Sequence, residues 1–359
     1  MSCRRALGLA ALFALSSAEG AQAQTRQVLL FAEGNRLQRL EIDSLDHPPV
    51  RERVLIERAS RDPVGGRDVN GMICTLPDGS GRFVAGDDTG QPAAPAGWSV
   101  FDREGAVVAR LVATAITDHP EPYGCAFDPG GRLFTTELGD PGFLRANGQL
   151  ILWFPPYDQD PGPAGAPRYC KLATDIGTAS GIAIDREGRV YVASAGRLAI
   201  RRFSPPFPSA PDAAGGCAAR DPTGAPLADS VRDEIFVRAL ATFSGLAMAP
   251  NGHLYAASVA TGEIREYDLS GRLVRKLLDP PGWLPPFATG TPQGLAVDAA
   301  GTLYYADLDL VWRFPTLDPG PDGKIWRIGF DARRQPRAPE AIVRHLEYPD
   351  GLGVADAAP

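Results

Sequence analysis

Residues 181–193, GIAIDREGRVYVA, carry the pattern that decides the fold: a glycine, a short apolar strand, an Asp-x-x-Gly turn and a second strand with an aromatic residue. The same pattern recurs at 71–85, 124–134, 245–255 and 294–304, and its first four residues return at 351–354. The leading glycines are 53, 57, 64, 49 and 57 residues apart. A period near 50 with short alternating strands is typical of β-propellers, in which each repeat forms a four-stranded blade.

The sixth copy of the repeat supplies one strand only, so it needs partners from elsewhere in the chain. Residues 27–31, 36–42 and 51–56 read as three strands without a leading glycine before them. An unpaired edge strand is prone to pairing with another chain, so the two ends of the sequence are expected to share one sheet. The sequence therefore predicts an all-β protein. We expect a six-bladed β-propeller, closed by one C-terminal strand and three N-terminal strands, in a single domain over residues 24–359.

Residues 1–23 have the features of a secretory signal peptide. Arg4 and Arg5 precede an apolar run from Ala6 to Leu15, and Ala21-Gln22-Ala23 is a small-x-small cleavage pattern. We expect cleavage after Ala23 and a periplasmic or secreted protein; the alternative is a buried N-terminal helix. No other stretch reaches the roughly 18 apolar residues that a membrane-spanning helix needs.

The composition narrows the classes of partner. Hydrophobic residues make up 44% and charged residues 22%, as in ordinary globular proteins and unlike disordered chains. The 36 basic and 43 acidic residues give a net charge of −7, which leaves no basic surplus for nucleic-acid phosphates. We therefore expect no nucleic-acid partner. We also expect a monomer with a small-molecule substrate or ligand.

The repeat resembles that of six-bladed propellers of the regucalcin/gluconolactonase and NHL-repeat type, and strictosidine synthase-like proteins share the general pattern. Asn70-Gly71 with Pro77-Asp78-Gly79, and also Pro349-Asp350-Gly351, resemble two segments of the gluconolactonase group. In that family such Asn and Asp residues, with a Glu near the N-terminus, hold a divalent cation over the central channel. The resemblance thus implies a calcium site formed by Glu33, Asn70 and Asp350, and a lactonase-like activity.

One face of the propeller is expected to collect polar groups, whatever the family. The innermost strand of a blade begins where its antiparallel second strand ends, so residues at both points lie at one mouth of the channel. The residues before the leading glycines are Asn70, Tyr123, Ser180, Ser244, Gln293 and Asp350. The residues at the ends of the second strands are Glu33, Asp87, Glu137, Ser194, Ser258 and Asp307. Carboxylates are thus concentrated in blades five, six, one and two.

Long loops on the same face carry His119, Trp283 and Trp312, and an acidic lobe walled by loops is what a small-molecule pocket needs. We expect a substrate pocket lined by Asp87, Tyr123, Gln293, Trp283 and Trp312. Oxygen ligands suit a hard cation such as calcium or magnesium, and Glu137, Asp307 or His119 would act as general base. For each carboxylate the alternative is a turn cap bonded to backbone N–H groups, and for His119 a solvated loop residue. Asp128, Asp185 and Asp298 are expected to cap turns on the opposite face.

Four cysteines follow the signal peptide. Cys170 and Cys217 lie in or beside long connections rich in Pro, Gly and Ala, and a Cys170–Cys217 disulfide would tie two neighbouring blades. Cys74 and Cys125 stand three residues and one residue after their leading glycines, hence at the same parity on equivalent strands. Such side chains would not face each other, so these cysteines are expected to be buried free thiols.

The sequence favours an exported, divalent-cation-dependent hydrolase that opens a lactone or related small ester at the acidic mouth. Two alternatives remain open at this point. One is a non-catalytic NHL-type propeller that presents a small molecule, glycan or protein. The other is a metal-free enzyme of the strictosidine synthase-like kind, since a fold alone does not fix a function.

Overall fold

The computed structural model describes residues 27–33, 36–42, 51–56, 68–88, 97–111, 121–139, 147–158, 168–210, 217–222, 224–228, 231–282, 285–313 and 316–356. Only the backbone is described for residues 51–56, 68–70, 87, 88 and 356. The predicted signal peptide, His119 and Trp283 lie outside the described residues, as do the side chains of Asn70 and Asp87.

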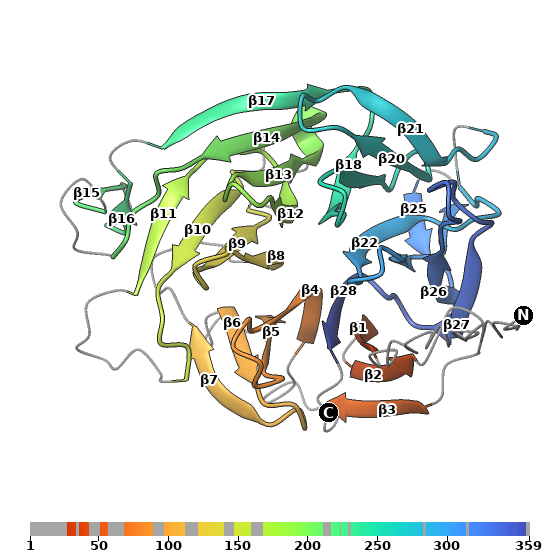
Figure 1. Cartoon of the computed structure of the whole chain (residues 1–359), viewed down its shortest axis with the longest axis horizontal. Coiled ribbons are helices and arrows are strands. Elements are labelled where there is room, and N and C mark those ends of the chain that lie inside the picture. The colour runs from red at the N-terminus through yellow and green to blue at the C-terminus, as the bar shows by residue number, and fades with distance from the viewer. Residues whose placement is uncertain are drawn as a thin grey trace, which may run out of the picture.

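Six four-stranded blades stand around a central axis, as Figure 1 shows. Blade one contains β4 (Asp68–Thr75), β5 (Phe83–Asp88), β6 (Gly97–Phe101) and β7 (Val107–Leu111). Blade two contains β8 (Pro122–Phe127), β9 (Leu133–Glu137), β10 (Gln149–Trp153) and β11 (Tyr169–Ala173). Blade three contains β12 (Ala179–Ile184), β13 (Val190–Ser194), β14 (Ala199–Ser204) and β17 (Arg232–Arg238). Blade four contains β18 (Phe243–Met248), β19 (Leu254–Ser258), β20 (Glu263–Tyr267) and β21 (Leu273–Leu278). Blade five contains β22 (Pro292–Val297), β23 (Leu303–Asp307), β26 (Gly323–Ile328) and β27 (Glu340–Leu346).

Blade six closes the ring in the way the sequence predicts. Its strand order is β28-β1-β2-β3, with β28 (Leu352–Asp356) innermost and β1 (Gln27–Glu33), β2 (Arg36–Ile42) and β3 (Arg51–Ile56) outside it. The antiparallel register joins Leu29 to Val354 and Phe31 to Leu352. The sequence-based prediction of an all-β six-bladed propeller is therefore confirmed.

Two additions extend the regular blades. Strands β15 (Ala219–Arg220) and β16 (Pro226–Leu227) lengthen the outer edge of blade two, and β24 (Leu310–Arg313) pairs with β25 (Thr316–Pro319) as a hairpin inserted in blade five. The one helical segment among the described residues is a 3₁₀ turn, Ala195–Arg197. Among the described residues we find no helix that is long and apolar enough to cross a membrane.

Close packing of the innermost strands explains why each repeat begins with glycine. A Cβ on Gly181 would lie 2.3 Å from the carbonyl oxygen of Ser244, and one on Gly245 would lie 2.1 Å from the carbonyl oxygen of Gln293. The innermost strands of neighbouring blades thus touch through their backbones, and only glycine allows that approach. Apolar side chains from facing blades, such as Leu246 and Ile200, fill the space between the sheets further out.

Asp128, Asp185 and Asp298 cap turns, as expected. The Oδ1 atoms of Asp128 and Asp298 accept the backbone N–H groups of Arg132 and Thr302, both at 2.8 Å. Asp185 accepts two backbone N–H groups in the same way. These turns join the first and second strands of their blades, at the end of the channel opposite the predicted mouth.

The disulfide prediction for Cys170 and Cys217 is confirmed, with their Cα atoms 5.7 Å apart. The prediction of free thiols at Cys74 and Cys125 is wrong, because these residues also form a disulfide, with a Cα–Cα distance of 6.0 Å.

The cause of the error is an additional residue at the start of β4. There the pairing jumps from Asn70–Gly86 to Ile73–Ala85, which skips two residues of β4. In β8 the jump from Pro122–Glu137 to Gly124–Thr136 skips one. The additional residue shifts Cys74 by one position, so Cys74 and Cys125 point to opposite faces of their sheets and meet between blades one and two.

Candidate functional site at the channel mouth

Side chains from opposite sides of the ring meet at the predicted mouth. Tyr123 begins the innermost strand of blade two, and its hydroxyl shares a hydrogen bond with the side chain of Gln293 from blade five. The Tyr123 hydroxyl also donates to the main-chain carbonyl of Asp350 at 3.5 Å. Asp350 in turn accepts the backbone N–H of Gly71 at its Oδ2 atom, at 3.2 Å. Blades one, two, five and six therefore all contribute to one buried polar cluster.

The Tyr123 phenol is held in its neutral form. Burial of the ring raises its pKa well above the ordinary value, and the negative charge of the Asp350 carboxylate raises it further. The hydrogen bond with Gln293 opposes this shift. A neutral phenol keeps its proton at any physiological pH, so Tyr123 is a permanent hydrogen-bond donor at the centre of the mouth.

Tyr348 lies close to Asp350, although the sequence analysis did not single it out. Desolvation of the ring, followed by the charges of Asp350 and Glu121, raises the pKa of Tyr348. Its backbone has a φ of 54°, in the left-handed region that a bulky residue rarely adopts. Its position directly before Pro349-Asp350-Gly351, the segment that resembles the gluconolactonase group, was the only sequence signal for it.

The predicted metal ligands Glu33 and Asp350 stand at the same end of the pair β1–β28. The backbone N–H of Ala32 donates to the carbonyl of Gly351 at 3.0 Å, so Glu33 and Asp350 are the next residues outward on their strands. Glu33 is buried and accepts hydrogen bonds from the side chain of Gln38 and from the backbone N–H of Glu347, the latter at 3.0 Å. The backbone of Asn70 adjoins Gly71, whose N–H Asp350 binds.

This donor set fits a hard divalent cation in its chemistry, because every candidate ligand atom is an oxygen. Neutral donors contact both carboxylates: the Gln38 amide and the Glu347 N–H donate to Glu33, and the Gly71 N–H donates to Asp350. The described residues contain no group of three His, Cys, Asp or Glu side chains placed to share an ion. A cation at this point would therefore take its remaining ligands from Asn70, backbone carbonyls or water.

Glu137 and Asp307 have different surroundings. Glu137 ends β9 opposite Pro122, next to Tyr123, and its Oε1 accepts the indole N–H of Trp98 at 3.2 Å. Asp307 ends β23 opposite Pro292, next to Gln293. Its carboxylate accepts three hydrogen bonds, from the backbone N–H groups of Thr291 and Asp309 at 2.6 and 2.9 Å and from the Trp326 indole at 3.0 Å. These contacts fit the turn-capping alternative for Asp307.

The remaining pocket residues are not joined to this cluster by a described contact. Trp312 lies on the inserted strand β24 and is 42% exposed. Asp87 is placed by its backbone alone, at the end of β5 opposite Val69. The structure thus brings together Tyr123, Gln293 and Asp350 from the predicted set. Glu33 on β1 pairs beside β28 in blade six, and Glu137 on β9 pairs beside β8 in blade two.

No family model and no curated protein matches the sequence. Among solved structures, the chain is similar to one described as a nidogen/laminin complex, at 13% identity and a TM-score of 0.58, over 92% of this chain and 99% of that chain. It is also similar to a luciferin-regenerating enzyme, at 13% identity and a TM-score of 0.51, over 87% of this chain and 93% of that chain. A calcium-binding regucalcin from Agrobacterium tumefaciens matches at 13% identity and a TM-score of 0.48, over 79% and 85% of the two chains. At this level of identity a likeness shows the fold alone, which is the six-bladed β-propeller described above.

Proposed function

We propose that the protein is a hydrolase that opens a lactone or related small ester at the channel mouth, with a divalent cation, calcium in the first instance, as cofactor. The observation that carries the proposal is the cluster of Tyr123, Gln293 and Asp350, in which a neutral phenol stands beside a carboxylate. Hydrolysis of an ester needs a donor for the developing oxyanion and a base for the attacking water; Tyr123 would be the donor, and Glu137 on the neighbouring strand would be the base.

Tyr123 is the proposed donor to the carbonyl oxygen of the substrate, toward which its single O–H would turn from the main-chain carbonyl of Asp350. Its proton is secured by burial and by the Asp350 charge, so it stabilises an oxyanion without first changing its own protonation state. Gln293 fixes the direction of the phenol through their hydrogen bond. In this role Tyr123 strengthens its bond as negative charge develops on the substrate oxygen, which favours the transition state over the ground state.

Glu33, Asn70 and Asp350 are the proposed cation ligands. A divalent cation bound there would supply Lewis acidity toward a substrate carbonyl. The Gly71 N–H bond helps to orient Asp350, and the Glu347 N–H and Gln38 bonds orient Glu33.

Glu137 is the preferred general base among the three candidates. It lies on the strand beside Tyr123, whereas the Asp307 carboxylate is engaged by three protein donors. We retain His119, on the entry loop of blade two, as the alternative base. The remaining proposed pocket walls are Asp87, Trp283 and Trp312.

We further propose that the protein is exported and that residues 1–23 are removed. The two disulfides agree with this, since disulfides persist in oxidising compartments.

Calorimetric titration of the mature protein with calcium, and separately with magnesium, tests the proposal. We expect one site per chain, lost in Asp350→Asn and kept in Asp279→Asn, which removes an exposed carboxylate paired with Lys276 elsewhere. The Asn side chain retains an acceptor for the Gly71 N–H, so loss of binding would report on charge rather than on folding. Absence of binding, or equal binding by both variants, would remove the cation from the proposal.

A non-catalytic binding propeller is the second candidate, and exposed aromatic side chains favour it. Trp312 and Tyr348 are each 42% exposed, and exposed aromatic residues are common anchors for protein or glycan partners. A screen of five- and six-membered lactones and aryl esters separates the candidates. Turnover that depends on Tyr123 supports an enzyme. If this turnover requires the cation, the enzyme is the proposed hydrolase; if it proceeds without the cation, the enzyme is metal-free. Retention of a ligand that depends on Trp312, without turnover, supports the binding protein.

A further inference from the structure

A cavity lies at the opposite end of the channel from the candidate site. Its volume is about 440 Å³, within the range of small-molecule sites. The turns between first and second strands of blades one to four wall it, from Pro77 in blade one to Asn251 in blade four. None of the residues assigned to the channel mouth lines this cavity, so it is a separate site.

The floor of the cavity is apolar because of the repeat itself. Phe127, Ile184 and Met248 each stand three residues after a leading glycine, at the end of an innermost strand. All three line the cavity and are only half-buried, although each also packs against a hydrophobic cluster. An apolar ligand that covered their exposed parts would be stabilised by removing that surface from water.

The charged residues that line the cavity differ in whether they have an ion-pair partner. Asp128 is paired with Arg132 at 2.7 Å, and Asp185 with Arg189 at 2.6 Å; Arg189 also pairs with Glu187, at 3.1 Å. Arg186 is exposed at the rim, and its guanidinium donates to the carbonyl of Pro250 at 2.9 Å. Within the described ranges Arg186 forms no ion pair, which leaves its remaining N–H groups available to an anion.

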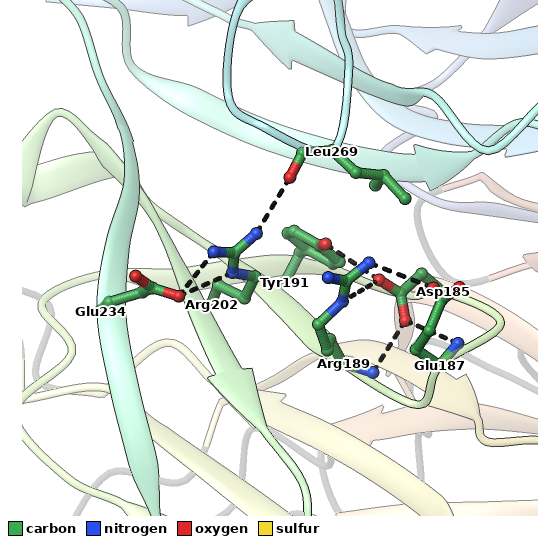
Figure 2. A network of polar contacts seen from close by, with 7 residues as sticks. All are labelled: Asp185, Glu187, Arg189, Tyr191, Arg202, Glu234 and Leu269. Atoms are coloured by element: carbon green, nitrogen blue, oxygen red, sulfur yellow. Dashed lines mark hydrogen bonds and ion pairs between the residues drawn. The ribbon is translucent and has the colours of Figure 1, made fainter.

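The wall is held in place before any ligand binds. Figure 2 shows Asp185 between Arg189, Tyr191 and Glu187, and Arg202 between Glu234 and Leu269. Leu269 belongs to blade four and lines the cavity, and its carbonyl accepts the Arg202 guanidinium of blade three at 3.0 Å. Blades three and four are thus fixed to each other beside the cavity, which reduces the entropy cost of binding.

We propose that this cavity binds a small carboxylic acid with an aromatic or aliphatic body. The body would lie on Phe127, Ile184 and Met248, and the carboxylate would bind Arg186. The site is independent of the chemistry proposed for the channel mouth, because the two share no residue.

Calorimetric titration of the mature protein with benzoate, 1-naphthoate and decanoate tests the proposal. We expect at least one of these to bind with one site per chain, and Arg186→Ala to weaken that binding by about tenfold or more, since hydrogen bonds to charged groups contribute that much. Arg333→Ala is the matched control, because Arg333 is an exposed turn arginine of blade five that does not line the cavity. Glu187→Gln removes a negative charge from the rim and should leave binding equal or tighter.

Two more variants distinguish binding in this cavity from binding at the channel mouth. Met248→Glu places a charge on the half-buried floor and should abolish binding, while Asp350→Asn, at the other mouth, should leave it unchanged. Failure of all three acids to bind would overturn the proposal. So would an unchanged affinity in Arg186→Ala, or equal affinity for 1-naphthoate and the uncharged 1-naphthalenemethanol.

Discussion

The backbone N–H of Gly71 donates a hydrogen bond to Oδ2 of Asp350 at 3.2 Å, although 279 residues separate the two in the chain. Around this bond the backbones of blades six and one are in contact, since a Cβ on Gly351 would lie 1.4 Å from the carbonyl oxygen of Gly71. The junction that closes the ring therefore also orients the carboxylate of the candidate site. Substitutions here have to separate an effect on closure from an effect on function.

Gly71→Ala should destabilise the protein more than Gly79→Ala. Both glycines have a φ of +71°, so both substitutions carry the cost of a left-handed backbone, about 1–2 kcal/mol. A Cβ on Gly71 would also lie 2.3 Å from the carbonyl oxygen of Tyr123, whereas one on Gly79 meets nothing within 4 Å. We expect an additional cost of about 1–3 kcal/mol for Gly71→Ala, measured by urea unfolding. Equal losses in the two variants would show that blades one and two are not in contact at this point.

Replacing Cys74 and Cys125 together by serine should lower the free energy of unfolding by roughly 4 kcal/mol, the loop-closure value for a separation of 51 residues. Serine is close to cysteine in volume, so the main change is the loss of the cross-link between blades one and two. Urea unfolding of oxidised wild type and variant measures the difference, and mass spectrometry of non-reduced peptides identifies the bond. An intact mass showing two free thiols in the exported protein would contradict the pairing.

Tyr123→Phe should reduce turnover of a lactone or ester substrate by about 10²–10³-fold in kcat, the usual effect of removing one oxyanion donor. The ring remains, so packing at the mouth is retained. Tyr304→Phe is the control, because it also removes a buried hydroxyl, bonded to Asp298 at the opposite end of blade five. If both variants lose the same activity, the effect comes from stability and Tyr123 has no role as donor.

The protein should lose stability above pH 10. In the folded protein, burial raises the pKa of the tyrosines, to about 12 for Tyr191 and Tyr255. In the unfolded chain the same tyrosines ionise near pH 10. Below pH 10 both states are neutral and this contribution to stability is fully present. As the pH rises above 10 the unfolded state releases protons first, and each tyrosine lowers the free energy of unfolding by up to about 1.4 kcal/mol per pH unit.

Absorbance at 295 nm and urea midpoints between pH 9 and 12 measure this effect. Tyr191→Phe should make the fall in stability less steep than in wild type over that interval. Tyrosines that titrated near pH 10 in the folded protein, with no fall in the urea midpoint, would contradict the expected burial.

The repeat explains why the fold was accessible from sequence while part of the site was not. A leading glycine before a short apolar strand reports a backbone contact between blades, and that contact recurs at each of the six copies. Cys74 points to the other face of its sheet than its distance from the leading glycine predicts, because β4 contains one additional residue. A bulge of this kind cannot be recognised from the alternation of apolar and polar residues.

The site depends on contacts across the channel, which local pattern does not encode. The position of Tyr123 and of Gln293 before a leading glycine predicted that each lies at the mouth. It did not predict the hydrogen bond between them, which joins blades two and five. Tyr348 was missed because it precedes Asp350 in a connection outside the strands. The cavity at the opposite end of the channel was missed because the turns that wall it were interpreted only as caps.

The pairing of β28 with β1 also imposes an order of assembly during synthesis. A ribosome releases β1, β2 and β3 first and β28 last, so blade six stays incomplete, with an open edge on β1, until the other five blades have been made. Blades one to five form from segments contiguous in the chain and are able to fold as they emerge. A nascent or prematurely terminated chain lacking β28 would therefore carry a nearly complete propeller that exposes a hydrophobic strand, which is a ready target for chaperones and proteases.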